Sequence, residues 1–343
     1  TLDRSSAASD VYKRQVYVPA IHLSYLFLGG ICAIIFSWIE RCFKKKRYRT
    51  AYVANKRPPD LQALTSFPFL LIANHENNEN LPSCPLDALI IDLKHYPPSR
   101  NQRIALFRQS MARNIPVYSP KKWLENYEER LRLTTLQQHD LATLNPKVHP
   151  YLILKRILDI LCIVWVLPIV LPLFLIIALI IRIESRGPAI FTQSRVGYLG
   201  REFKIYKFRS MHHQAEKTGA QFASKEDIRI TRIGKIIRQL RIDELPQFFN
   251  VLKGDMSLIG PRPEQKIFVD QFDETIPYYR YRHHVKPGIS GLAQVRQGYA
   301  ANAEETAVKL EYDLFYIKHL SLGLDILIFI KTLCTIFTGF GAR

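Results

Sequence analysis

Asp243 and Glu244 form an adjacent pair of carboxylates whose setting suits catalysis. Basic residues precede the pair closely, and a stiff Pro-Arg-Pro-Glu segment follows it at 261–264. A carboxylate can attack phosphorus or hold Mg²⁺, and arginines can neutralise phosphate oxygens. The combination therefore predicts a phosphoryl-transfer site with a metal ion. The competing interpretation is a helix start beside a solvated basic face, because Asp and Glu are favoured in the first helical turn.

Two neighbouring carboxylates suit the two tasks that such a site requires. Metal coordination withdraws the electron pairs that a nucleophile needs, so one carboxylate serves poorly for both attack and metal binding. The residue types alone do not say which member of the pair does which. The adjacent His283 and His284 are not predicted to bind metal, because adjacent residues do not share a helix face.

The composition points to an anionic partner. The 343 residues can hold two modest domains, or one domain with membrane segments, and the net charge is +18. We predict phosphorylated substrates or an anionic membrane surface, and no nucleic acid, since no zinc-finger or RNA-binding signature is present. The five cysteines are scattered without a C-x-x-C, which indicates neither a disulfide framework nor a metal site and favours a reducing compartment.

The N-terminal part predicts one transmembrane helix. Residues 1–15 have no apolar core of a signal peptide, and we expect them to be non-native or disordered. Residues 16–40 are almost uncharged and long enough to cross a bilayer. The basic run at 41–49 follows at once, and the positive-inside tendency places that end in the cytoplasm.

Residues 51–145 predict a small α/β domain. Short buried strands are expected at 69–73, 88–92 and 115–118, with a helix over 98–112. This alternation favours parallel strands. Because no G-x-G-x-x-G is present, we predict a structural or oligomerising role for this domain and no dinucleotide.

A second uncharged run, residues 157–183, predicts a re-entrant membrane helix. Pro168 and Pro172 lie near its centre, where each removes a backbone donor. A spanning helix would also export the many basic residues that follow, against the positive-inside tendency. A helix that enters, breaks at the prolines and returns satisfies both constraints. The apolar segment 320–340 carries two charges, and we expect an interfacial or core-packing helix there.

Four motifs occur here in a fixed order and carry a family resemblance. They are K-I-Y-K-F-R-S-M at 204–211, D-E-L-P-Q-x-x-N at 243–250, G-D-M-S-L-I-G-P-R-P-E at 254–264 and P-G-I-S-G-L-A-Q at 287–294. Together they resemble the bacterial sugar transferases, the monotopic polyprenyl-phosphate phosphoglycosyl transferases. The resemblance implies a mostly α catalytic domain over 151–343 with a re-entrant hairpin. Residues 51–145 resemble a shortened form of the Rossmann-like domain of larger members.

The resemblance also implies an activity. The family moves a phospho-sugar from a UDP-sugar to polyprenyl (undecaprenyl) phosphate and releases UMP, which starts exopolysaccharide, O-antigen, capsule or glycoconjugate assembly. Asp243 would be the nucleophile that forms an aspartyl-phosphosugar intermediate, and Glu244 would hold Mg²⁺. The catalytic domain would lie on the cytoplasmic face of the bacterial inner membrane, among its lipids. A homodimer is compatible with this organisation.

Further residues are expected to bind the substrate phosphates and the nucleotide. The guanidinium fork of an arginine matches two phosphate oxygens, so Arg238 and Arg262 are phosphate candidates. Lys207 and Arg209 are further candidates, against the alternative of a solvated basic strand edge. Pro261 and Pro263 fix the backbone of the expected nucleotide-binding loop. The same loop ends in Glu264, for which metal contact and helix capping both stay open.

After Gln294 the chain reads Val-Arg-Gln-Gly-Tyr where relatives often carry Asn-Gly-Arg. A uridine or sugar contact in this loop is therefore not predicted, and whether Arg296 substitutes for it stays open.

Three rivals to this interpretation can be distinguished. A polytopic transferase would need many spanning helices, and this sequence has at most three candidate segments. A nucleic-acid binder would lose affinity steeply as salt rises. The alternative from another class is a non-catalytic membrane scaffold or regulator of glycan assembly.

Overall fold

The computed structural model describes residues 50–53, 70–73, 81, 85–91, 93, 100–145, 149–212, 229–298 and 302–338. The predictions for residues 1–15 and for the transmembrane helix at 16–40 lie outside these residues. The description that follows is confined to the part of the chain after residue 45, which forms one compact unit.

A small parallel sheet opens the described chain. Its strands are β1 (Thr50–Val53), β2 (Leu70–Ala73), β3 (Ala88–Ile91) and β4 (Val117–Tyr118), and they lie in the order β2-β1-β3-β4. All three strand pairs are parallel. Both faces are covered, as parallel sheets require: Leu106 of α3 (Arg100–Ala112) packs with one face and Trp123 of α4 (Pro120–Glu128) with the other.

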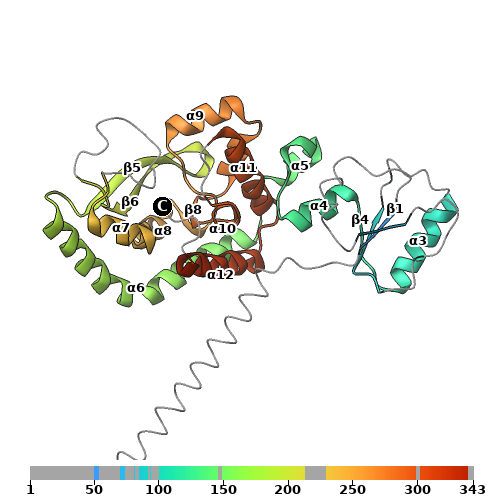
Figure 1. The fold of residues 1–343 in the computed structure, drawn as a ribbon, viewed down its shortest axis with the longest axis horizontal. Helices are drawn as coiled ribbons and strands as arrows, with labels where there is room; N and C mark the ends of the chain where they lie inside the picture. Colours follow the sequence, from blue (N-terminus) through green and yellow to red (C-terminus); the bar gives the residue numbers. More distant parts are fainter. Residues whose placement is uncertain are drawn as a thin grey trace, which may run out of the picture. The chain divides into compact units, whose positions relative to one another are not determined.

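The three predicted strands and the predicted helix correspond to β2, β3, β4 and α3, whereas β1 and α4 were not predicted. Figure 1 shows α3 and α4 beside the sheet. The identification of this α/β unit as a shortened Rossmann-like domain stays a prediction.

Helix α4 joins the sheet to the rest of the chain. It begins after Ser119, whose side chain accepts a hydrogen bond from Lys122 N, and it ends at Glu129 in the left-handed conformation. One face of α4 packs on the sheet, and the other carries the buried Glu125. The Glu125 carboxylate accepts from Lys318 at 3.0 Å, at the end of α11 (Ala303–Lys318). A short 3-10 turn (Leu133–Thr135) and α5 (Gln138–Thr143) follow.

Helix α6 (Tyr151–Glu184) has 34 residues and contains both Pro168 and Pro172. Within the described residues it is the one helix long and apolar enough to cross a membrane, and 17% of its most apolar window is buried. At 1.5 Å per residue the helix is about 50 Å long, well beyond the thickness of a hydrocarbon core. Trp165, near its middle, is 82% exposed.

The predicted break at Pro168 and Pro172 is absent from the helix. The hydrogen-bonded helix continues through both prolines, and Figure 1 shows it bent along its length. Each end is bonded to the region that follows α6 in the chain: Arg156 donates to Val251 O near one end, and Arg209 donates to Ser185 O at the other. The re-entrant course in a membrane stays a prediction.

The region after α6 is a chain of short elements. An antiparallel hairpin is made by β5 (Ile190–Val196) and β6 (Glu202–Phe208), joined by a 3-10 turn at Tyr198–Gly200. The elements that follow are α7 (Arg232–Gln239), η3 (Ile242–Glu244), α8 (Gln247–Lys253), β7 (Ser257–Ile259), α9 (Lys266–Thr275), η4 (Tyr279–His284), β8 (Gly288–Ser290), α10 (Leu292–Arg296), α11 and α12 (Leu322–Thr338).

The core of this region lies among α9, α10, α11 and α12, with Leu314 and Ile328 fully buried. Strands β7 and β8 pair in parallel beside it. Helix α12 packs into this core. This agrees with the core-packing alternative that was predicted for the apolar segment 320–340. Its buried Asp325 accepts from Tyr151 OH at 2.5 Å and from Tyr316 OH at 2.8 Å, while Phe329 on the same helix is 54% exposed.

Candidate active site

The dyad Asp243-Glu244 lies on η3, between α7 and α8. Helix α7 ends at Leu240, and Arg241 then adopts a left-handed φ of 55°, which turns the chain into η3. Helix α8 begins after Pro246 within one turn of the dyad. The two carboxylates are thus held on a tight connection between two helices rather than in the first turn of one long helix.

The motif residue Asn250 ties the dyad to the strand that carries Lys207. Its side-chain oxygen accepts from Tyr206 N at 3.0 Å, and its amide donates to Lys204 O at 2.7 Å. Asn250 is fully buried, so both bonds form away from solvent. This pairing explains why D-E-L-P-Q-x-x-N and K-I-Y-K-F-R-S-M form one site although they are distant in sequence.

Glu244 is buried and surrounded by cations. Arg262 Nη2 donates to its Oε1 at 2.8 Å, while Lys207 Nζ lies 3.9 Å from the same oxygen. Arg241 Nη1 lies 3.9 Å from Oε2. Burial favours the neutral acid, but these positive charges outweigh it and lower the pKa of Glu244 to about 2. Glu244 is therefore ionised throughout the physiological range.

Asp243 has the opposite character. Burial, and then the negative charge of Glu244, raise its pKa to about 6, against the opposing charges of Lys207, Arg262 and Arg238. Environments that push the pKa values of two adjacent carboxylates apart are typical of residues with different catalytic roles. At neutral pH Asp243 is mostly ionised, yet it is a stronger base than an exposed aspartate.

The four cations around the dyad, Lys207, Arg238, Arg241 and Arg262, outnumber the two carboxylates. Burial, with the charge of Arg262, lowers the pKa of Lys207 to about 8, which leaves it largely protonated at neutral pH. An excess of positive charge at a partly buried site favours a multivalent anion such as a diphosphate.

Buried ion pairs hold the loop 261–264 in place. Arg282 Nη2 donates to Arg262 O at 3.0 Å and to Asp313 Oδ2 at 2.8 Å. Glu264 lies 3.1 Å from Lys309 Nζ and 3.5 Å from Arg195 Nη1. Burial opposes its ionisation, but these cations lower the pKa of Glu264 to about 2. Its carboxylate is thus held by two cations, and no described contact places it as a helix cap.

The structure brings together most of the residues that the sequence singles out, but Arg209 is placed apart from the dyad. Its guanidinium donates to Ser185 O at 2.7 Å and to Ile181 O at 3.3 Å, so it caps the last carbonyls of α6. This position favours a structural contact over the predicted phosphate contact. Arg238 lies nearer: its Nε donates to Ser210 Oγ at 2.8 Å, and its charge acts on Asp243.

The sequence marks Arg241 only as one of the basic residues that precede the dyad, and it assigns no role to Arg195 or Lys309. In the structure Arg241 contacts Glu244, and the other two contact Glu264. The signal for Arg241 was its position next to the dyad. Arg195 and Lys309 belong to distant elements and no motif marks them.

The dyad can supply part of the ligand set of a Mg²⁺ ion. No cluster of three or more potential ligands from His, Cys, Asp and Glu occurs among the residues that the structure describes, so a complete protein cage is not available in that part. Mg²⁺ in phosphoryl-transfer sites is commonly held by one or two carboxylates together with substrate phosphates. Glu244 can supply one such carboxylate while Asp243 stays available for attack, and the substrate phosphates would complete the coordination shell.

Comparison with known proteins gives consistent matches. The family described as bacterial sugar transferase matches residues 150–339. The UDP-N-acetylgalactosamine-undecaprenyl-phosphate N-acetylgalactosaminephosphotransferase of Aeromonas hydrophila is 47% identical over 97% of this chain and 75% of its own length. UDP-glucose:undecaprenyl-phosphate glucose-1-phosphate transferases are 42% identical in Klebsiella pneumoniae, over 55% of this chain and 40% of that protein, and 41% identical in Caulobacter vibrioides, over 54% and 70%.

Proposed function

This chain belongs to the bacterial sugar transferase family, and on that premise we propose that it transfers a phospho-sugar from a UDP-sugar to undecaprenyl phosphate with release of UMP. The transfer starts the assembly of a surface polysaccharide or glycoconjugate. The relative from Aeromonas hydrophila, which matches nearly the whole chain, is named for UDP-N-acetylgalactosamine, so this donor is the first to test.

The observation that carries the proposal is the pair of carboxylates with separated pKa values inside a ring of four cations. Asp243 attacks the sugar-linked phosphorus, the bond from that phosphorus to the UMP oxygen breaks, and UMP leaves with the electron pair. An oxygen of undecaprenyl phosphate then attacks the same phosphorus and Asp243 leaves as a free carboxylate. Two half-reactions at one carboxylate replace one difficult transfer.

We assign the roles of the cations from their positions around the dyad. Arg262, Lys207 and Arg238 bind the phosphate oxygens and offset the charge that develops during each displacement. Glu244 would hold Mg²⁺ together with the substrate phosphates, and a bound Mg²⁺ would supply further neutralisation of phosphate charge. Glu264, held by Lys309 and Arg195, keeps the Pro261–Pro263 loop and its Arg262 in place.

We further propose that α6 is a re-entrant membrane helix on the cytoplasmic side of the inner membrane. Its exposed apolar surface, the two prolines, the bend in Figure 1 and the attachment of both ends to one catalytic region support this course. The carbonyls freed at the prolines need partners in such a setting. The arrangement keeps Asp243 within reach of both a cytosolic nucleotide sugar and a lipid phosphate at headgroup level. A homodimer stays a prediction.

The test is UMP release by purified protein in detergent, with and without undecaprenyl phosphate and Mg²⁺. We expect Asp243→Asn to lower turnover by at least about a thousandfold, because the nucleophile is lost while the fold is kept. Asp270→Asn, an exposed carboxylate on α9, is the matched control and should retain wild-type turnover. Full activity of Asp243→Asn would refute the role of Asp243. Folded wild-type protein that releases UMP from no UDP-sugar would instead favour the alternative of a non-catalytic scaffold.

A further inference from the structure

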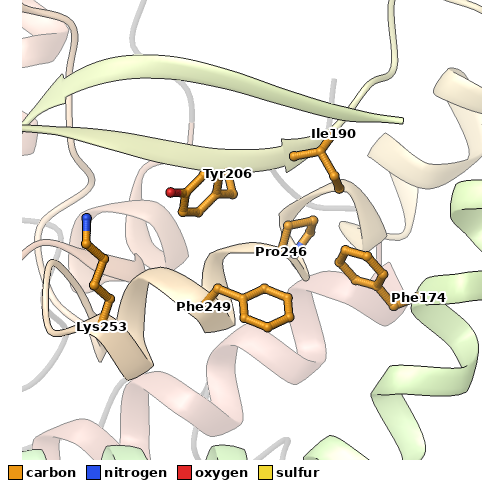
Figure 2. Close-up of a pocket in the computed structure, with 6 residues that line it drawn as sticks. All are labelled: Phe174, Ile190, Tyr206, Pro246, Phe249 and Lys253. Carbon is orange, nitrogen blue, oxygen red and sulfur yellow. The ribbon is translucent and has the colours of Figure 1, made fainter. Parts of the chain in front are cut away.

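An apolar pocket lies beside the dyad segment, and the proposed chemistry does not use it. Figure 2 shows its lining side chains converging from α6, from the β5–β6 hairpin and from the start and end of α8. The cavity has a volume of about 410 Å³, within the range of small-molecule sites. The lining residues are Phe174, Ile190, Tyr206, Pro246, Phe249 and Lys253.

The chemistry of the lining suits a hydrocarbon. Phe174 and Phe249 meet edge to face with their ring centroids 5.8 Å apart. The ring centroids of Phe174 and Phe208 are 4.7 Å apart. Lys253 is the one charged side chain in the lining, and it is already 3.1 Å from Asp255. A nucleotide sugar needs many hydrogen-bond partners, which this pocket does not offer.

The pocket connects the catalytic segment to the exposed apolar surface of α6. Pro246 follows Asp243 within one turn and forms part of the wall. Phe174 forms another part, and its helix neighbours Leu171 and Leu175 are 46% and 63% exposed. Phe249 is itself 43% exposed, so the pocket is open at the surface. A chain held here would have one end near the dyad and the other next to lipid.

We propose that this pocket holds the first isoprene units of the polyprenyl phosphate acceptor. The inference rests on the proposed function, which requires an acceptor whose phosphate reaches Asp243 while its tail stays in the membrane. The tail must leave the site through an apolar passage, because stranding isoprene units in water is costly. The pocket is apolar, begins at the dyad segment and continues into the exposed apolar residues of α6.

The test compares two phenylalanines of similar exposure. Phe249→Ala removes a pocket wall, whereas Phe329→Ala removes an exposed aromatic on α12 that is outside the pocket. Because Phe249 is partly exposed, its truncation leaves no sealed cavity, and a thermal melt of both variants checks the fold. The acceptor is geranyl phosphate in detergent, which has the first isoprene units but no long tail to partition into a membrane.

We expect the KM for geranyl phosphate to rise about tenfold in Phe249→Ala, since the lost contact corresponds to about half of a buried phenyl side chain. Phe329→Ala should keep the wild-type KM, and Phe249→Leu should recover most of the loss. An unchanged KM in Phe249→Ala, or an equal rise in Phe329→Ala, would overturn the proposal.

A separate measurement distinguishes failure of the pocket from failure of the activity. In a single turnover without acceptor, wild-type protein should release UMP from the UDP-sugar as Asp243 is modified. If this release occurs and the acceptor KM does not respond to Phe249, the pocket assignment alone is wrong. If wild-type protein releases no UMP, the proposed function fails and the pocket assignment fails with it.

Discussion

Replacing Arg262 by glutamine should move the acidic limb of the pH–rate profile to higher pH. Arg262 donates to Glu244 at 2.8 Å, and its charge lowers the pKa values of both carboxylates. The pKa of Asp243 is raised to about 6 by burial and by Glu244, and under the proposed mechanism its carboxyl must be ionised to attack. Activity is therefore present above this pKa and is lost as the pH falls through it. Removing a positive charge raises the pKa, so the loss begins at higher pH.

The size of the shift follows from Coulomb's law. A unit charge about 6 Å from a carboxylate is worth about 3 kcal/mol at an effective dielectric constant of about 20, or about two pKa units. The hydrogen bond of Arg262 goes to Glu244 rather than to Asp243, and its side chain is 32% exposed and partly screened by solvent. We therefore expect about one unit. The activity of each enzyme at about pH 6 is expressed as a fraction of its own plateau activity. This fraction should be about one fifth as large in the variant as in the wild type.

The assay is kcat/KM for the UDP-sugar between pH 5 and 9, because this parameter reports the ionisation of the free enzyme. The measured value belongs to the coupled dyad rather than to one residue. Arg280→Gln removes the same charge from a side chain that is 75% exposed and pairs with Asp273, and it should leave the limb unchanged. The reasoning is refuted if the limb stays in place in Arg262→Gln, or if both variants shift it equally.

Two further predictions concern the scaffold behind the site. Asp313→Ala leaves the buried guanidinium of Arg282 without its 2.8 Å partner, which should destabilise the protein by about 3–5 kcal/mol and lower its melting temperature in detergent. An unchanged melting temperature would show that this pair does not hold the catalytic loop. Gly288→Ala would place a Cβ 2.1 Å from Gly260 N between β7 and β8, so we expect little folded protein; Gly323→Ala, with nothing within 4 Å, should fold normally.

Residues that are close in sequence were predictable as one cluster of charged side chains. Asp243 and Glu244 lie on one short turn, and Arg241 contacts Glu244 from the same turn. The prolines around Arg262 restrict its backbone in any fold. Local restrictions of this kind can be recognised in the sequence, because they do not depend on how distant elements pack. The apolar run at 157–183 also predicted a membrane helix, and it forms most of α6, but the predicted break at the prolines is absent.

Contacts between distant elements were not predictable. Glu129 receives Arg296 at 2.8 Å across a separation of 167 residues, and Glu264 receives Lys309 across 45. Charged residues with such partners look like ordinary surface residues in the sequence. Arg209 shows the reverse case, because its motif suggested a phosphate contact while the ends of α6 and β6 bring it to the last carbonyls of α6. Only tertiary packing decides between these outcomes.

The charges of the dyad also give a physical reason for a divalent cation. In the structure, Arg262 compensates the buried charge of Glu244, and Lys207 lies near the same oxygen. Under the proposed function, an arriving diphosphate competes for these same side chains, since their charges also act on Asp243. A buried carboxylate that loses its partner is costly. Mg²⁺ held between Glu244 and the phosphates would restore that balance, whereas substrate binding without it would leave two anions to share one set of cations. We therefore infer that donor binding, and not only the chemical step, weakens when Mg²⁺ is removed.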